Sequence, residues 1–389
     1  MFDFSAFVTD THSIVLAALM LAAMLFLCLY YGLYHFRLGR HGLKDGGAKA
    51  DDAALPPVSV VLTAHNEAEW LKENLVYLLE QEYPNFEVVV VDYLSTDDTQ
   101  YVLKVLMGYY PHLKVRPFLE DVNLFQGRKY PLSIGIKSAA NDILLLADPE
   151  CIPSNLHWLR GMVRGYMDGS GKVDGTTQVV LGYCGVKPTR SLLGWLQQYD
   201  ALAYGSQYLG SALLGHVYTG SGRNLSYRRG FFFERGGFIS HYDIADGSDD
   251  LFVYQNANRG NTRICIDSDA VLMVEPCKSF AQWHAQRRRR VASRSRHKLG
   301  GRLRESLPMA AVALFYAAAV ALLLLGTLPW PVVALAAAMK WAWQIVCFSM
   351  LTKRFDGGWV HWVAPLMEIY FTVANTILIL LPLSSNRKF

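Results

Sequence analysis

At 389 residues the chain is longer than one typical domain and leaves room for roughly two to three units. Hydrophobic residues make up 52% of the sequence and the mean hydropathy is +0.17, so we expect part of the chain to lie in lipid. The net charge of +4 is uneven, because positions 287–304 hold nine Lys and Arg and no acid, which leaves −5 for the rest. The six cysteines form no close metal-binding pairs, which argues against a zinc domain and fits a reducing, cytosolic setting.

The first predicted element is a membrane helix over residues 14–34, a run of 21 residues without a charge. At about 1.5 Å per residue this run spans a hydrocarbon core, and it is too long for the apolar part of a signal peptide. Arg37, Arg40 and Lys44 follow it and place the next part of the chain in the cytoplasm by the positive-inside rule. We therefore predict an N-terminal anchor over residues 1–36. Residues 37–56 are predicted to be a linker, because this stretch is rich in Gly, Ala and Asp.

Residues 57–275 are predicted to form one cytoplasmic domain in which strands alternate with helices. The expected strands are 58–63, 86–91, 113–115 and 143–146, and the expected helices include one that follows Glu67 and one over 129–140. This alternation has the spacing of right-handed βαβ units. The predicted fold class is therefore α/β, with a doubly wound and mostly parallel sheet.

Acidic residues follow three of these strands. Glu67 comes after the first, Asp92 ends the second, and Asp148 and Glu150 follow the fourth. Ligands of open α/β sheets bind at the carboxyl ends of the strands, so we expect these acids to line one site. Ionised carboxylates accept hydrogen bonds from a nucleobase or ribose, and a pair of them can hold Mg²⁺ or Mn²⁺ against phosphates. For Asp148 and Glu150 taken alone, a solvated surface turn is the alternative.

Two common nucleotide-binding motifs are missing from the sequence. Neither a Walker-type Gly-rich loop nor a G-x-G-x-x-G motif follows the first strand. These motifs supply the backbone that approaches phosphates in P-loop and dinucleotide-binding proteins. Their absence argues against a P-loop ATPase and against an NAD enzyme.

Short motifs occur in a distinctive order between positions 57 and 290. They are Ala64-His65-Asn66-Glu67, Val91-Asp92 with Ser95-Thr96-Asp97-Asp98-Thr99, Gly127-Arg128-Lys129, Asp148-Pro149-Glu150-Cys151, Gly222-Arg223-Asn224-Leu225-Ser226-Tyr227-Arg228, Gly236-Gly237-Phe238, Asp249-Asp250 and Gln286-Arg287-Arg288-Arg289. In this order they resemble the membrane-bound branch of the family 2 glycosyltransferases. The resemblance implies a GT-A-like fold and a nucleotide-sugar donor, most often UDP-linked.

The resemblance also implies roles on the donor side of the site. Glu67 and Asp92 would contact the nucleoside, and Lys129 would lie near the diphosphate. Asp148 and Glu150 would stand where the family's Asp-x-Asp motif binds the metal, Mg²⁺ or Mn²⁺. Glu150 replaces the second Asp of that motif, which lengthens the side chain by one methylene group and keeps its charge.

The remaining implied roles concern catalysis and the acceptor. Asp250 would deprotonate the acceptor hydroxyl, with Asp249 beside it, because direct displacement at the anomeric carbon needs a general base. Gln286 and Arg289 would steady the donor or the leaving group. Arg290 stands where processive members carry Trp, which favours transfer of a single sugar. The residues of the acceptor-side segment are Gly222, Asn224 and Tyr227.

Residues 276–305 are predicted to be a basic interfacial segment. Anionic lipid is the expected partner, at about 1 kcal/mol per basic residue near the membrane surface. Nucleic acid is not expected, because the chain is tethered and the basic run has no interleaved aromatic residues.

Residues 306–389 are predicted to contain about three transmembrane helices, which would make the protein integral to the cytoplasmic membrane. The helices are expected over 309–328, 332–351 and 360–383. Lys340 and Glu368 fall within the last two, where an unpaired charge costs about 3 kcal/mol. We therefore predict that these two side chains form an ion pair. The alternative is that Lys340 reaches toward a membrane interface.

Together these features predict an inverting, metal-dependent glycosyltransferase at the cytoplasmic membrane face. Its acceptor would be a lipid-linked or growing glycan, as in the synthesis of a cell-envelope polysaccharide. Two alternatives remain, a processive polysaccharide synthase and a membrane-anchored nucleotide-sugar binder that has lost catalysis.

Overall fold

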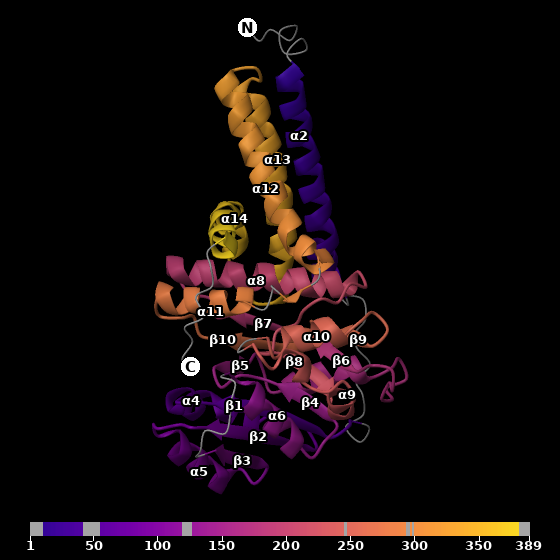
Figure 1. The fold of residues 1–389 in the computed structure, drawn as a ribbon, viewed down its shortest axis with the longest axis vertical. Coiled ribbons are helices and arrows are strands. Elements are labelled where there is room, and N and C mark those ends of the chain that lie inside the picture. Colours follow the sequence, from indigo (N-terminus) through magenta and orange to yellow (C-terminus); the bar gives the residue numbers. More distant parts are fainter. Residues whose placement is uncertain are drawn as a thin grey trace. The chain divides into compact units, whose positions relative to one another are not determined.

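The computed structural model describes residues 11–41, 55–118, 127–244, 247–292, 296–297 and 299–380. The chain divides into two compact units. One unit combines residues 1–41 with 297–382 and holds the long apolar helices. The other consists mainly of residues 42–296 and holds every strand found among these described residues (Figure 1).

A seven-stranded sheet forms the centre of the second unit, in the order β3-β2-β1-β4-β8-β6-β9. The strands are β1 (Val58–Ala64), β2 (Phe86–Tyr93), β3 (Leu113–Phe118), β4 (Ile143–Leu146), β6 (Val179–Leu181), β8 (Leu225–Arg228) and β9 (Thr262–Ile264). Strands β1 to β4 are mutually parallel, whereas β8 runs antiparallel to both β4 and β6. The predicted α/β fold with a mostly parallel sheet is confirmed.

Helices connect the parallel strands and cover the sheet. They are α4 (Ala68–Leu79), α5 (Thr99–Tyr109), α6 (Lys129–Ser138), α7 (Trp158–Val163), α8 (Leu192–Leu213), α9 (Arg229–Glu234), α10 (Asp250–Asn256) and α11 (Phe280–Ala292). Helix α4 buries Leu71, Leu75 and Leu78 in the main core beside the valines of β1 and β2. Helix α6 comes very close to β1, because a Cβ atom at Gly135 would lie 2.7 Å from Cγ1 of Val61. The predicted strands and the helix predicted over 129–140 agree with this structure to within a few residues.

A second, three-stranded sheet continues the chain beyond β4, in the order β5-β10-β7. Its strands are β5 (Cys151–Pro153), β7 (Tyr183–Val186) and β10 (Val271–Val274). Strand β5 begins directly after Glu150. The short turn that carries Asp148 and Glu150 therefore joins the two sheets.

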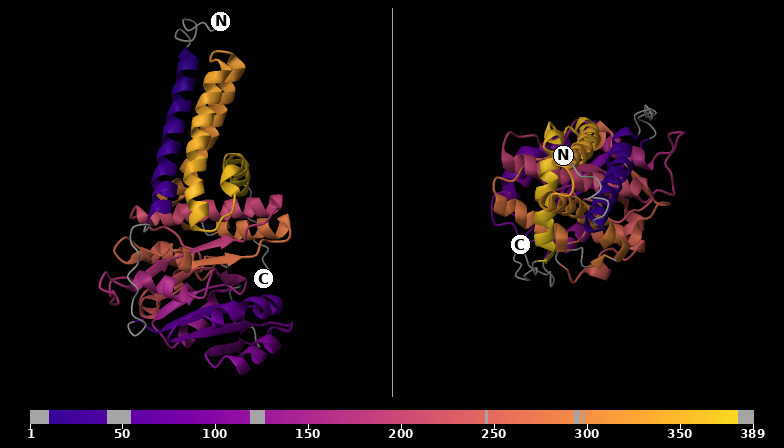
Figure 2. Two further views of the ribbon diagram at one scale, coloured as in Figure 1. Left: turned by 180° about the vertical axis from the view of Figure 1, so that it is seen from behind. Right: turned by 90° about the horizontal axis from the view of Figure 1, so that it is seen from above.

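Among its described residues, the first unit contains three helices that are long and apolar enough to cross a membrane. The first is one continuous helix that consists of α2 (Thr11–Tyr30), a π-helical stretch (Tyr31–Phe36) and α3 (Arg37–Arg40). The second is α12 (Leu299–Leu325) and the third is α13 (Trp330–Arg354). Among the described residues only two of the roughly three predicted C-terminal spans are found. Helix α14 (Ala364–Leu380) has 17 described residues and packs against α12 and α13. It runs across these two helices instead of alongside them (Figures 1 and 2).

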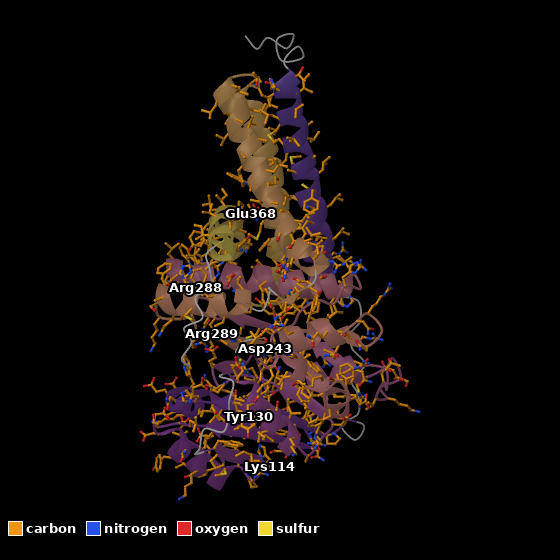
Figure 3. The ribbon with its side chains drawn as sticks, viewed as in Figure 1. Lys114, Tyr130, Asp243, Arg288, Arg289 and Glu368 are labelled. Atoms are coloured by element: carbon orange, nitrogen blue, oxygen red, sulfur yellow. The ribbon has the colours of Figure 1, made fainter. Side chains whose placement is uncertain are left out.

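The predicted ion pair between Lys340 and Glu368 is confirmed. Nζ of Lys340 contacts a carboxylate oxygen of Glu368, and Lys340 has no exposed surface. The hydroxyl of Tyr31 donates a second hydrogen bond to the same carboxylate. Since an apolar environment strongly disfavours an isolated charge, the pair satisfies both side chains and joins α13 to α14, which carries Glu368 (Figure 3).

Candidate active site

Carboxylates gather where two central strands end. Glu67 follows β1, and Asp148 and Glu150 follow β4. These strands are hydrogen-bonded neighbours that run parallel, with Val61 opposite Leu146, so the chain leaves both at the same edge of the sheet. Asp249, just before α10, also belongs to this cluster, because it interacts electrostatically with Asp148. The edge predicted to bind a ligand therefore carries at least four acidic side chains.

Two arginines bind the carboxylates that follow β4. Nη1 of Arg128 lies 2.7 Å from Oδ1 of Asp148. Nε of Arg223 lies 3.4 Å from Oδ2 of Asp148, and Nη2 of the same guanidinium contacts Oε1 of Glu150. Arg223 thus bridges the acid pair, whereas Arg128 contacts only Asp148.

Strand pairing explains why Arg223 reaches this acid pair. In the antiparallel β4–β8 ladder Leu146 lies opposite Leu225. Asp148 is two residues after Leu146 and Arg223 is two residues before Leu225, so continuing the register brings these two side chains together. The sequence alone indicates no role for Arg128 or Arg223, although both lie within the motifs Gly127-Arg128-Lys129 and Gly222-Arg223-Asn224. The pairing of β4 with β8 is the information that the sequence lacks.

The cluster holds more negative than positive charge. Burial raises the pKa of Glu67 to about 8, with further contributions from Asp148 and Glu150. Burial also raises the pKa of Glu150 against the opposing effect of Arg223, and the pKa of Asp249 against that of Arg128. Oε2 of Glu67 is buried without a hydrogen-bond partner among the described residues. Burial disfavours the ionised form of each carboxyl group, whereas the part of these pKa shifts that comes from neighbouring carboxylates would be relieved by a cation.

The donor set fits a divalent cation that takes ligands from a substrate. Asp148 and Glu150 offer the carboxylate oxygens that Mg²⁺ and Mn²⁺ prefer. In the described part of the chain, no group of three or more His, Cys, Asp and Glu side chains is arranged to hold a metal ion. Mg²⁺ is commonly held by one or two carboxylates together with phosphates, so a diphosphate would complete its coordination here.

The segment before α10 is packed tightly against the loop before β8. A Cβ atom built on Gly222 would lie 1.7 Å from Oδ2 of Asp249, so only glycine leaves room for this carboxylate. The hydroxyl of Ser248 donates to Oδ1 of Asp249 at 3.1 Å. Asp250 begins α10, and its Oδ1 accepts from the backbone N–H of Leu251 at 2.7 Å. The two acids are thus adjacent in sequence and held by different contacts.

Comparison with known proteins identifies the second unit. Residues 59–233 match the family model for glycosyl transferase family 2. The chain carries a family 2 glycosyltransferase domain. Glycosyltransferase AglE of Haloferax volcanii is 33% identical over 109 residues, which are 28% of this chain and 34% of that protein. Poly-β-1,6-N-acetyl-D-glucosamine synthase of Staphylococcus epidermidis is 25% identical over 105 residues, 27% of this chain and 24% of that one. The chain therefore spans about a third or less of the length of these relatives.

A solved structure agrees with the GT-A-like fold of the family 2 domain. The mannosyltransferase PcManGT from Pyrobaculum calidifontis, in complex with GDP-Man and Mn²⁺, superposes with a TM-score of 0.56 at 21% sequence identity. The match covers 93% of this chain and 98% of that one. The predicted GT-A-like fold is confirmed.

Within the family 2 domain, the side chain of Lys129, which is expected near the diphosphate, binds backbone carbonyl groups. Its side chain is buried, and Nζ donates to the backbone carbonyl of His241 at 2.7 Å and to that of Ile244. The amine therefore ties helix α6 to the segment before α10. The preceding residue, Arg128, is the basic side chain of this motif that contacts the acid cluster.

The side chains expected on the acceptor side of the glycosyltransferase domain are largely buried. Asn224 donates from Nδ2 to the carbonyls of Tyr183 and Ala270, each at 2.7 Å, and its Oδ1 accepts from Trp158 at 3.2 Å. Tyr227 stacks on Phe232 and is 1% exposed. The side chains of Asn224 and Tyr227 are therefore packed inside the domain. Gly222 supplies the close approach to Asp249.

Helix α11 carries the two residues expected to steady the donor. Gln286 is half-buried and Arg289 is exposed (Figure 3). The neighbouring Arg287 and Arg290 point toward α8, where both contact the carboxylate of Asp200. Arg290, at the position of the family's Trp, therefore joins α11 to α8.

Asp92, like Asn224, is an expected site residue that is fully buried in the glycosyltransferase domain. It lies near the end of β2, has no exposed surface, and neither of its carboxylate oxygens has a hydrogen-bond partner among the described residues. A buried carboxylate without a partner costs several kcal/mol, so such a group is an expected place for a ligand's donor atoms.

Proposed function

We propose that this protein is an inverting glycosyltransferase that moves a sugar from a nucleoside-diphosphate sugar to a lipid-linked or glycan acceptor. UDP is the proposed nucleoside diphosphate. The observation that carries the proposal is the acid cluster, with Asp148 and Glu150 next to Asp249, at the strand ends of a family 2 glycosyltransferase domain. That arrangement combines a cation site with candidate bases.

The donor diphosphate is proposed to bind beside Asp148 and Glu150. These two carboxylates would hold Mg²⁺ or Mn²⁺, which supplies positive charge to the departing diphosphate. Arg128 has buried Nε and Nη2 atoms without hydrogen-bond partners among the described residues, and these can donate to phosphate oxygens. Glu67 and Asp92 would accept hydrogen bonds from the nucleoside.

Asp250 is the proposed general base. Inversion requires the acceptor hydroxyl to attack the anomeric carbon from the face opposite the leaving diphosphate, and the hydroxyl loses its proton in that step. Asp249 stands next to Asp250, and burial together with the charge of Asp148 raises its pKa against the opposing effect of Arg128. We keep Gln286 and Arg289 as proposed contacts of the donor or leaving group and Gly222 as the proposed acceptor-side position.

The proposed location is the cytoplasmic face of the membrane. Arg37 and Arg40 end the first apolar helix and Lys353 and Arg354 end α13, which fits the positive-inside rule if both ends face the cytoplasm. The proposed organisation is an anchor over 1–36, a linker over 37–56, a catalytic domain over 57–275, a lipid-contacting basic segment over 276–305 and membrane helices over 306–389. Helix α12 begins at Leu299, so the basic segment overlaps its first turns.

Two variants of the full chain in detergent test the proposal. Asp250→Asn should abolish release of the nucleoside diphosphate from a panel of nucleotide-sugars while UDP binding survives. Asp148→Ala should lose Mn²⁺-dependent UDP binding. Asp243→Asn is the matched control, because Asp243 is half-exposed and pairs with Arg296. Wild-type turnover in Asp250→Asn would contradict the base assignment, and undiminished affinity in Asp148→Ala would contradict the metal site.

A processive polysaccharide synthase is the second candidate. It is favoured by the 25% identity to a poly-β-1,6-N-acetyl-D-glucosamine synthase over 105 residues. The pairing of Arg290 with Asp200 favours the single-transfer proposal instead, because the site then lacks the aromatic residue of that motif. Product length on a gel separates the two candidates.

A further inference from the structure

The loop before β8 holds the backbone of Arg223 in a fixed place. The N–H of Asn224 donates to the carbonyl of Ser221 at 2.9 Å, and the Asn224 side chain is anchored to Tyr183 and Ala270. The thiol of Cys151 lies 3.7 Å from the carbonyl oxygen of Arg223. Any large change at this position is therefore confined to the arginine side chain, which is 29% exposed.

The Arg223 guanidinium occupies the acid pair that the proposed metal would use. It lies against Oδ2 of Asp148 and Oε1 of Glu150, while Arg128 takes Oδ1 of Asp148. Both carboxylates that can ligate a cation are thus engaged by arginine. A divalent cation on Oδ2 of Asp148 and Oε1 of Glu150 would place its charge beside the guanidinium, and the two positive charges would repel each other.

We propose that Arg223 is a built-in counterion of the Asp148–Glu150 pair that is displaced by the divalent cation and then binds the donor's diphosphate. This inference rests on the metal role given to Asp148 and Glu150 under Proposed function. Without a donor, Arg223 offsets the repulsion between two carboxylates in a partly buried site. When the cation arrives with a diphosphate, the fixed backbone keeps the released guanidinium within reach of phosphate oxygens, which it binds well.

The bridging contact assigns this role to Arg223 instead of Arg128. Arg128 contacts one carboxylate only and is held in the cluster by Asp148, Asp249 and Glu67. Arg223 contacts both members of the pair, so a cation must compete with it directly.

The competition makes cation and nucleotide binding cooperative. A cation that binds alone must displace Arg223 and leaves the guanidinium without a new anionic partner. A cation that binds together with a diphosphate provides the guanidinium with phosphate oxygens as its new partner. Each ligand then raises the affinity for the other by the same factor, as linkage requires, and coupling of this kind is typically about 5-fold to 150-fold.

The test compares the full-length wild type with Arg223→Gln. Arg263→Gln is the control, because Arg263 is half-exposed and its ion pair with Asp174 is long, at 3.9 Å. The Kd of Mn²⁺ is measured by electron paramagnetic resonance with and without UDP. Arg223→Gln should bind Mn²⁺ alone more tightly, and the factor by which UDP improves Mn²⁺ binding should fall by at least about fivefold. An unchanged or weaker Mn²⁺ affinity without UDP, together with an unchanged factor, would overturn the proposal.

Asp148→Ala separates this inference from the proposed function. If Asp148→Ala loses Mn²⁺ binding while Arg223→Gln behaves as wild type, only the counterion role fails. If Asp148→Ala keeps full Mn²⁺ affinity, or if the wild type binds no Mn²⁺ with or without UDP, the metal site and the counterion role both fail. Arg223→Lys keeps one positive charge but cannot bridge two carboxylates, so it should change Mn²⁺ binding in the same direction by a smaller factor. If Arg223→Gln does not fold, Arg223→Lys tests the counterion role of Arg223 by the same criteria.

Discussion

Removal of the Lys340 charge should strongly destabilise the unit that contains the apolar helices. The Lys340 side chain has no exposed surface and that of Glu368 is 7% exposed. In Lys340→Met the carboxylate of Glu368 keeps only the hydroxyl of Tyr31 as a described donor. Leaving one partner of a buried pair uncompensated costs about 3–5 kcal/mol, so we expect a loss of at least 3 kcal/mol in the free energy of unfolding.

Glu368→Gln should be the milder of the two single changes. Nζ of Lys340 lies 5.1 Å from the ring centre of Tyr316, 5.7 Å from that of Phe315 and 6.0 Å from that of Tyr31. Each desolvated cation–π contact contributes about 0.5–2 kcal/mol and remains when the carboxylate is removed. The double variant removes both charges. Its loss in the free energy of unfolding should therefore be smaller than the sum of the losses in the two single variants by about 2–3 kcal/mol.

The assay is unfolding of the full chain in detergent by increasing SDS, followed by tryptophan fluorescence. Lys353→Met is the control, because Lys353 is exposed in the last turn of α13. The reasoning would be refuted if Lys340→Met were as stable as the wild type, or if the two single costs added to within about 0.5 kcal/mol.

Three further changes test the glycosyltransferase domain. Gly222→Ala should reduce turnover at least about tenfold, because its Cβ would lie 1.7 Å from Oδ2 of Asp249 and must push that carboxylate and the adjacent Asp250 aside, and a misplacement of about 1 Å can cost about 100-fold. Burial lowers the pKa of His241 to about 4, so below pH 6.5 the unfolded chain binds a proton that the folded domain does not. The free energy of unfolding should therefore fall as the pH is lowered from 6.5 toward 4. His241→Asn should make this fall smaller in thermal unfolding experiments. Asp200→Asn should lower the free energy of unfolding by at least about 2 kcal/mol, because it leaves the buried Arg287 without its carboxylate.

Each of these changes has a matched control in the same domain. Gly175→Ala adds a methyl group where nothing lies within 4 Å, His216→Asn removes an exposed histidine, and Asp243→Asn removes a half-exposed carboxylate. Normal turnover in Gly222→Ala, an unaltered pH profile in His241→Asn, or a stability of Asp200→Asn equal to that of Asp243→Asn would each contradict the corresponding expectation.

The sequence predicts the parallel part of the sheet because its strands are continuous apolar runs. Val58–Ala64 and Ile143–Leu146 are buried on almost every residue, so their pattern leaves few alternatives. Strand β8 is different, because Leu225–Arg228 has four residues and its partner β4 lies far away in the chain. The antiparallel β8, and with it the position of Arg223, could not be predicted from local pattern.

The candidate site was predictable as a set of acids and less so as a set of contacts. The acids after β1 and β4 are placed by strand ends, which the sequence marks clearly. Arg128 and Lys129 are adjacent at the start of α6, where successive residues of a helix point in different directions. Which of the two meets the carboxylates depends on the exact start of that helix, and this is the least predictable property of an element. The Lys340–Glu368 pair was predictable because the energetic cost of isolated charges left few alternatives.

The course of α14 bears on which side of the membrane each end of the first unit occupies. Three crossings, by the N-terminal helix, α12 and α13, would put residue 11 and residue 355 on opposite sides. A helix that runs across α12 and α13 adds no fourth crossing, so residue 380 would stay on the side of residue 355 (Figure 2). The number of crossings made by the described helices is then odd.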